Sequence, residues 1–174
     1  MRKLLFALAA STIALTPATA ALKVGAAAPD FTTTGAVGGK EFKLHLADQL
    51  KKGPVVLYFF PKAFTSGCTA EAHAFSESIG DFKKAGAQVI GMSADDLKTL
   101  HDFSTKECRS AFPVATATPQ TQKAYDVAWA AHPGVTTRTS YVIDRSGRIA
   151  MVHDDLDFSQ HVAKTLAAVK GLKR

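Results

Sequence analysis

The sequence predicts a single α/β domain with a mainly parallel central sheet flanked by helices. Residues 55–60 (VVLYFF) form an unbroken apolar run, which is typical of a strand buried on both faces. An amphipathic helix follows, and residues 89–92 form a second apolar strand. Because strands and helices keep alternating along the chain, we expect parallel pairing under a cover of helices, with a final hairpin as an antiparallel edge.

The helix after the first strand has the clearest pattern. Its apolar face carries residues spaced 4, 3, 4 and 3 positions apart, namely Cys68, Ala72, Phe75, Ile79 and Phe82. We expect Thr65 or Ser66 to cap its start and Glu71 to lie in its first turn. Gly86 follows its basic last turn and predicts its end.

The remaining elements follow from shorter patterns. We expect a second helix from residue 95 to about 109, a short strand over 112–115 and a helix over 119–128. Residues 141–143 and 149–152 flank a turn-rich segment, which predicts a β-hairpin. Apolar residues from Phe158 to Val169 at helical spacing predict the last helix.

The first twenty residues have the pattern of a cleaved secretory signal. Arg2 and Lys3 precede an apolar stretch over 4–15, and Ala18-Thr19-Ala20 gives a small-x-small cleavage site. The apolar stretch is shorter than the roughly 20 residues that span a bilayer. We therefore expect a signal peptide over 1–20 and a domain over 21–174. The mature protein would be periplasmic or secreted, with no stable membrane association.

Composition limits the partners. The 174 residues are 47% hydrophobic and 21% charged, which excludes a disordered, collagen-like or multi-pass membrane protein. The basic residues are scattered without aromatic interleaving, so we expect no nucleic-acid partner. Two cysteines are too few for a four-thiolate zinc site, and the six histidines lack ligand spacing. We predict neither a metal nor a cofactor.

Cys68 lies where a reactive thiol is expected. It follows the carboxyl end of a buried strand and opens a helix, and α/β proteins usually bind ligands at such a position. Unpaired N–H groups and the helix dipole there favour a thiolate. Its place on the apolar face of the helix fits a buried structural cysteine equally well. Position alone leaves both interpretations open.

Several motifs around Cys68 resemble those of peroxiredoxins. Pro61, Thr65 and Cys68 reproduce the P-x-x-x-T-x-x-C signature. Residues 24–31, 138–144 and 146–149 resemble the opening of that family, its arginine-bearing strand and the turn after that strand. The chain looks most like the bacterioferritin comigratory protein (Q-type) branch, which implies a thioredoxin-like fold and a monomer. It departs from the branch at His73, where many members carry a second cysteine, and residues 63–65 resemble a one-cysteine branch.

The resemblance implies roles for the residues around Cys68. Cys68 would attack the peroxide and become a sulfenic acid, and Thr65 would donate to the thiolate or orient the peroxide. Arg138 would hold the thiolate ionised, Pro61 would shield it from water, and Glu71 would orient the arginine. Without the family, Thr65 is a helix cap, Arg138 a surface cation and Glu71 a partner of the helix dipole.

Cys108 is the second thiol; 39 residues separate it from Cys68, and it lies in the predicted second helix. By resemblance it would resolve the sulfenic acid as a Cys68–Cys108 disulfide, which requires Cα atoms within about 7 Å and therefore local unwinding of the active-site helix. A permanent structural disulfide and an unpaired thiol remain as alternatives.

The sequence thus predicts an exported thiol-dependent peroxidase acting on hydrogen peroxide and organic hydroperoxides. A thioredoxin-like or other dithiol reductant would restore it. The alternative function is a non-enzymatic peroxide sensor or thiol relay, which would stop after stoichiometric oxidation.

Overall fold

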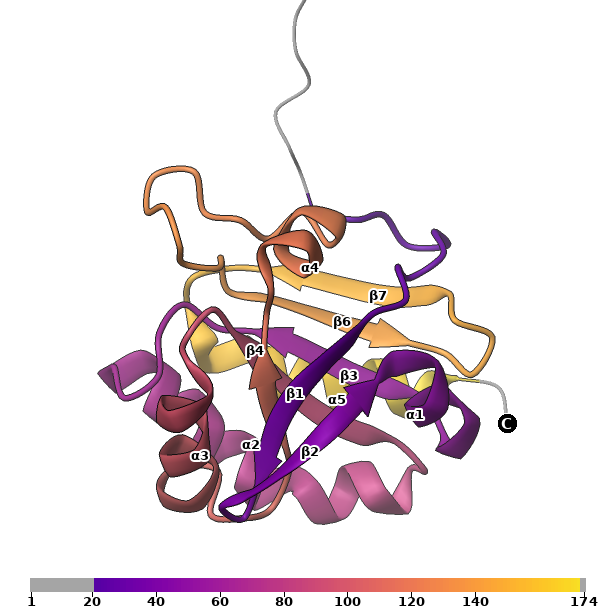
Figure 1. The fold of residues 1–174 in the computed structure, drawn as a ribbon. Coiled ribbons are helices and arrows are strands. Elements are labelled where there is room, and N and C mark those ends of the chain that lie inside the picture. The colour runs from indigo at the N-terminus through magenta and orange to yellow at the C-terminus, as the bar shows by residue number, and fades with distance from the viewer. Residues whose placement is uncertain (1–20, 173–174) are drawn as a thin grey trace, which may run out of the picture.

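The computed structural model describes residues 21–172 (Figure 1). The expected signal peptide over 1–20 lies outside the described residues, so it stays a prediction. Within the described part of the chain, no helix is long and apolar enough to cross a membrane.

The residues form one domain around a seven-stranded sheet of order β2-β1-β5-β4-β3-β6-β7. Its parallel part is limited to β3 (Val55–Phe59), β4 (Gln88–Ser93) and β5 (Val114–Thr116). The predicted hairpin, β6 (Thr139–Ile143) and β7 (Ile149–Asp154), pairs antiparallel with β3. At the other edge β1 (Thr32–Val37) pairs antiparallel with β5 and with β2 (Lys40–His45). The sheet is therefore mixed, and the expectation of a mainly parallel sheet is corrected, because hydrophobic periodicity carries no information on strand direction.

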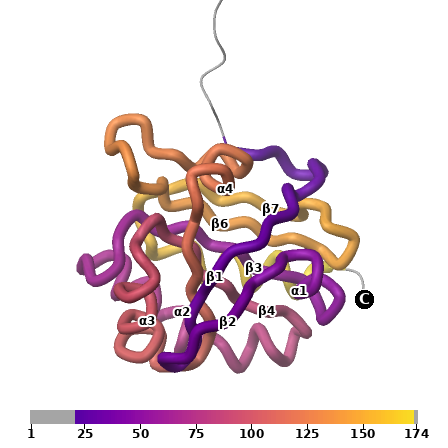
Figure 2. Tube along the Cα trace, in the orientation of Figure 1, coloured from indigo at the N-terminus to yellow at the C-terminus, as the bar shows by residue number. Residues whose placement is uncertain are grey.

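Helices cover both faces of the sheet. The helices α2 (Ser66–Lys84), α3 (Leu97–Lys106) and α5 (His161–Gly171) share a core with Val56 and Tyr58 of β3. The short helices α1 (Leu46–Lys52) and α4 (Pro119–Ala124) lie on the opposite face, where Leu57 and Phe59 point. Figures 1 and 2 show α1 in front of the sheet and α5 behind it. A 3₁₀ turn, η1 (Phe158–Gln160), precedes α5.

Two helices are shorter than the sequence indicates. α3 begins after Asp96, whose side chain accepts a hydrogen bond from the Thr99 N–H, and it ends at Lys106 rather than near 109. α4 ends at Ala124 because Asp126, two residues later, has a left-handed backbone with φ of 54°. The N-terminal hairpin and α1 are not among the predicted elements.

Candidate active site

Cys68 is the third residue of α2, directly beyond the carboxyl end of β3. Its side chain is 1% exposed. Thr65 is the N-cap residue, and the first bond of the helix runs from the Thr69 N–H to the Thr65 carbonyl at 2.9 Å. The N–H groups of Gly67 and Cys68 therefore have no acceptor within the helix. They provide donors for negative charge at the helix N-terminus.

Arg138 reaches the thiol from a distant part of the sequence. It immediately precedes β6, and the pairing of Thr139 with Phe59 brings it beside the carboxyl end of β3. Its Nη2 donates to Cys68 Sγ at 3.4 Å, and its Nε donates to the Leu156 carbonyl at 2.9 Å. With 6% exposure it is a buried cation, so the interpretation as a surface cation is wrong.

Gly67 makes room for this arginine. A Cβ at position 67 would lie 3.2 Å from Arg138 Nη2, which is tighter than an ordinary contact. A larger residue before Cys68 would therefore require the guanidinium to shift by a few tenths of an ångström.

Glu71 contacts the same arginine. Its Oε2 accepts a hydrogen bond from Arg138 Nη1 in a buried ion pair. Because α2 begins at Ser66, Glu71 lies in the second turn and faces inward, so its expected place in the first turn is corrected. Burial raises the pKa of Glu71 to about 7, although Arg138 acts in the opposite direction.

A histidine that was not predicted from the sequence lies next to Glu71. His161 is fully buried, and its Nδ1 is 3.7 Å from Glu71 Oε1. Its ring nitrogens lie 2.8 Å from Ser140 Oγ and 2.9 Å from the Asp155 carbonyl oxygen. Burial lowers the pKa of His161 to about 4. From sequence, a histidine in an amphipathic helix is usually interpreted as a surface residue. Its burial could have been inferred only from the helical spacing of the apolar residues in α5.

Thr65 and Pro61 frame the site less closely than expected. The Thr65 side chain is exposed and its hydroxyl donates to the Lys62 carbonyl at 2.9 Å. Thr65 is thus the N-cap residue, as expected, but its side chain makes no capping hydrogen bond. Pro61 is half-buried at the end of β3. Phe64, between them, has φ of 63° and is 44% exposed.

Cys108 is fully buried and free, just after α3, and burial raises the pKa of its thiol. Its carbonyl accepts a hydrogen bond from Ser76 Oγ at 2.9 Å. Ser76 lies eight residues beyond Cys68, which is about 12 Å along an α-helix. The two cysteines are therefore not placed for a disulfide in this state, and the alternative of a permanent bridge lacks support.

Of the predicted site residues, Cys68, Arg138 and Glu71 are in contact. Cys108, just after α3, instead contacts α2 at Ser76, and the Thr65 hydroxyl is hydrogen-bonded to the Lys62 carbonyl. Pro61 is half-buried beyond the end of β3. In the described residues, no three His, Cys, Asp or Glu side chains are placed to hold a metal ion.

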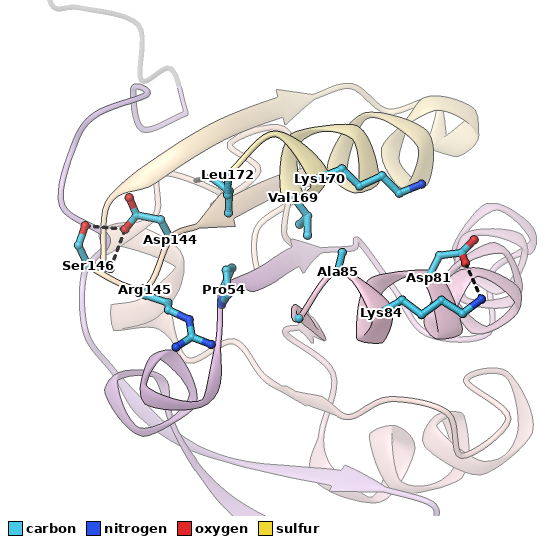
Figure 3. Close-up of a pocket in the computed structure, with 11 residues that line it drawn as sticks. Pro54, Asp81, Lys84, Ala85, Asp144, Arg145, Ser146, Val169, Lys170 and Leu172 are labelled. Atoms are coloured by element: carbon cyan, nitrogen blue, oxygen red, sulfur yellow. Dashed lines mark hydrogen bonds and ion pairs between the residues drawn. The ribbon is translucent and has the colours of Figure 1, made fainter. Parts of the chain in front are cut away.

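A cavity of about 1120 Å³ lies at the opposite end of β3 (Figure 3). Pro54, Arg145 and Leu172 line it, and none of the predicted site residues does. The candidate site is therefore the buried cluster at the start of α2 and not this cavity.

Comparisons with known proteins identify the family of this chain. The family model described as "AhpC/TSA family" matches residues 24–152. "Peroxiredoxin Q, chloroplastic" from Oryza sativa subsp. japonica is 33% identical over 149 residues, which are 85% of this chain and 67% of that protein.

Solved structures of peroxiredoxins have a similar fold. The peroxidoxin BcpB of Mycobacterium tuberculosis superimposes with a TM-score of 0.79 at 26% identity, covering 88% of this chain and 99% of that one. Peroxiredoxin Q of Xanthomonas campestris gives a TM-score of 0.68 at 26% identity and covers 79% and 89%. The thioredoxin-like fold expected from the sequence motifs is confirmed.

Proposed function

The chain belongs to the peroxiredoxin (AhpC/TSA) family and is most like its Q-type branch, and from this we propose that Cys68 is the thiol that attacks the peroxide. Family membership makes the protein a thiol-dependent peroxidase. One observation supports the residue assignment above all: the Arg138 guanidinium lies 3.4 Å from a buried cysteine at a helix N-terminus. This arrangement stabilises a thiolate and the negative charge that develops on a leaving oxygen.

The first step of the proposed reaction is assigned to the side chains and backbone of this chain. The Cys68 thiolate attacks one peroxide oxygen, the O–O bond breaks, and the other oxygen leaves as water or an alcohol after protonation. Cys68 becomes a sulfenic acid. Arg138 and the free N–H of Gly67 face the charge on the leaving oxygen. Hydrogen peroxide and organic hydroperoxides are the proposed substrates.

Thr65 has to turn for its proposed role. Its hydroxyl would leave the Lys62 carbonyl and donate to the bound peroxide or the thiolate. This requires only a side-chain rotation, since the residue is exposed. Pro61, next to Phe60 at the strand end, would limit the access of water to the sulfur.

Cys108 is the proposed resolving thiol. The start of α2 must unwind and Cys108 must leave the core before the sulfurs meet, because about 12 Å of helix separates their surroundings. Arg109 and Ser110 favour such an opening, since both are non-glycine residues with left-handed φ of 51° and 57°. A thioredoxin-like or other dithiol would then reduce the disulfide.

Export and a monomeric state complete the proposal. The charged, apolar and small-residue segments of residues 1–20 support a cleaved signal and a periplasmic or secreted location. Fractionation of cells followed by N-terminal sequencing tests this; a chain that keeps Met1 in the cytoplasmic fraction contradicts it. Light scattering tests the monomer.

Peroxide consumption under excess dithiol tests the assignment of Cys68. Cys68→Ser should abolish turnover, because an alcohol is a much weaker nucleophile than a thiolate. Cys108→Ser is the matched control: it should still lose its remaining thiol to one equivalent of peroxide at a similar rate. Near wild-type turnover in Cys68→Ser would refute the assignment, and wild-type protein that stops after one equivalent would be a relay rather than an enzyme.

A further inference from the structure

The buried cluster around Arg138 contains one cation and two acids. Cys68 is 1% exposed, Glu71 is 0% exposed and Arg138 is 6% exposed. Nη2 of the arginine donates to Cys68 Sγ, and Nη1 donates to Glu71 Oε2. The two acids therefore share one counterion. Since an unbalanced buried charge is costly, the guanidinium can balance only one of them at a time.

The second oxygen of Glu71 has surroundings that suit a protonated carboxyl group. Glu71 Oε1 is buried and has no hydrogen-bond partner among the described residues. His161 Nδ1 lies 3.7 Å from this oxygen. The Nε2–H of that ring donates to the Asp155 carbonyl, which leaves a neutral ring with only a lone pair at Nδ1. The Ser140 hydroxyl, 2.8 Å away, donates to this lone pair.

A carboxylate oxygen in this place would lack a donor for its negative charge. His161 offers Glu71 no proton, because its Nδ1 acts as an acceptor. A proton on Oε1 removes the charge from the oxygen that has no donor, while Oε2 still accepts from Arg138. The geometry therefore favours the neutral acid whenever Cys68 uses the arginine as its counterion.

The charge states agree with this geometry. Burial raises the pKa of Glu71 to about 7 and lowers the pKa of His161 to about 4. At neutral pH the ring is uncharged, and Glu71 can change its protonation state there. Other titratable groups around the cluster are Tyr58 on β3, His153 on β7, Lys164 on α5, and Asp155 and Asp157 between β7 and η1. None of them donates a hydrogen bond to Glu71 Oε1.

We propose that Glu71 takes up a proton when Cys68 loses one, and that His161 is the positioning residue that keeps Glu71 Oε1 without a donor and so able to hold that proton. The S–H bond of Cys68 breaks and its proton passes to solvent, while an O–H bond forms on Glu71 with a proton from solvent; no electrons are transferred. The cluster then holds a thiolate, a guanidinium and a neutral acid. The inference rests on the proposed role of Cys68. It adds that Glu71 becomes neutral, so that Arg138 balances the charge of the thiolate alone.

Infrared spectroscopy of the reduced full chain reads the proton on Glu71 directly. At neutral pH the wild type should show a protonated-carboxyl stretching band that Glu71→Gln removes. The band should weaken in Cys68→Ser, because no thiolate competes there for Arg138 and Glu71 can pair with it as a carboxylate. A wild-type spectrum without a band assignable to Glu71, or an equal band in Cys68→Ser, would overturn the proposal.

The pH dependence of Cys68 alkylation by iodoacetamide provides a second readout. It is measured in a Cys108→Ser background, so that Cys68 is the thiol that reacts. Glu71→Gln removes the competing charge but keeps the shape, so half-maximal reactivity should move to lower pH by about 1 unit. His161→Gln places an amide N–H near Oε1, which stabilises the carboxylate and should move the midpoint to higher pH by a similar amount. A purely structural role of His161 would not move it in that direction.

Unchanged midpoints, or shifts of the opposite sign, in variants with wild-type circular dichroism would refute the coupling. If His161→Gln does not fold, His161→Asn provides the same N–H donor. Alkylation requires no peroxide, so failure here leaves the peroxidase assignment untouched. The assignment of Cys68 as the peroxide-reactive thiol fails if Cys68→Ser still turns over.

Discussion

Replacing Arg138 with alanine removes the cation that contacts the Cys68 sulfur. At an effective dielectric constant of about 20, a guanidinium and a thiolate separated by 3.4 Å attract each other by about 5 kcal/mol. Part of this attraction is offset because Glu71, which pairs with the same guanidinium, must take up a proton when the thiolate forms. The remainder is comparable to the about 1.5–3 kcal/mol of a hydrogen bond to a charged group. Losing this stabilisation of the thiolate should make the reaction at neutral pH about 10- to 150-fold slower.

Stopped-flow measurement of the single-turnover reaction with hydrogen peroxide tests this figure. The thiolate absorbance should appear at higher pH in the same variant, because Cys68 ionises less readily without the cation. Alanine at 138 also leaves Glu71 without its partner, so the same substitution is repeated in Glu71→Gln, where no buried carboxylate loses a partner. A rate within a factor of about two of the parent in both backgrounds would refute the role assigned to Arg138.

The remaining predictions concern separate steps. Gly67→Ala should slow peroxide attack while leaving the fold intact, because its Cβ would lie 3.2 Å from Arg138 Nη2; single-turnover kinetics measure this, and an unchanged rate contradicts it. Cys108→Ser should accumulate a trappable sulfenic acid and overoxidise more readily, which mass spectrometry measures. If oxidised wild type contains no disulfide and still turns over normally, the protein is instead a one-cysteine peroxidase. Tyr58→Phe should keep or raise the free energy of unfolding in urea, since the buried hydroxyl has no partner among the described residues, and a loss above about 1 kcal/mol would contradict this. The imidazole of His161 is neutral in the folded state, with its pKa lowered to about 4, so its contribution to stability is present above pH 6.5 and is lost as pH falls to about 4. The stability advantage of wild type over His161→Phe should therefore shrink across that window, and a constant difference would refute the assignment of a buried neutral ring.

The sequence predicted the elements that build the site because their patterns are strong. The strand β3 is buried along its whole length, and the apolar face of α2 matches the observed core except at the half-buried Ile79. The N-terminal hairpin was missed because its strands are only partly buried, so the alternation is weak. Its turn contains Gly38 and Gly39 with φ of 54° and 72°, and this Gly-Gly pair was the available signal.

Within the site, prediction succeeded where a motif existed. Arg138 and Glu71 came from the resemblance to peroxiredoxins, since local spacing gives no reason for residues 67 positions apart to meet. His161 was missed because its burial depends on α5 packing over β6, which is a tertiary contact. The position of Thr65 was predicted and its hydrogen bond was not, because a side-chain rotamer depends on the folded surroundings.

The pairing of β6 with β3 has a consequence for when the thiol becomes reactive during folding. Cys68 is fixed by its own neighbours in the chain, but its cation arrives from a strand 70 residues away and only through the register that sets Thr139 opposite Phe59. A slip of that register by one residue would turn Arg138 to the other face of the sheet. An unfolded or partly synthesised chain therefore lacks the contact between Arg138 and Cys68, which forms only once the C-terminal third of the domain has docked. With the proposed role of Arg138, rapid reaction of Cys68 with peroxide would report that folding is complete.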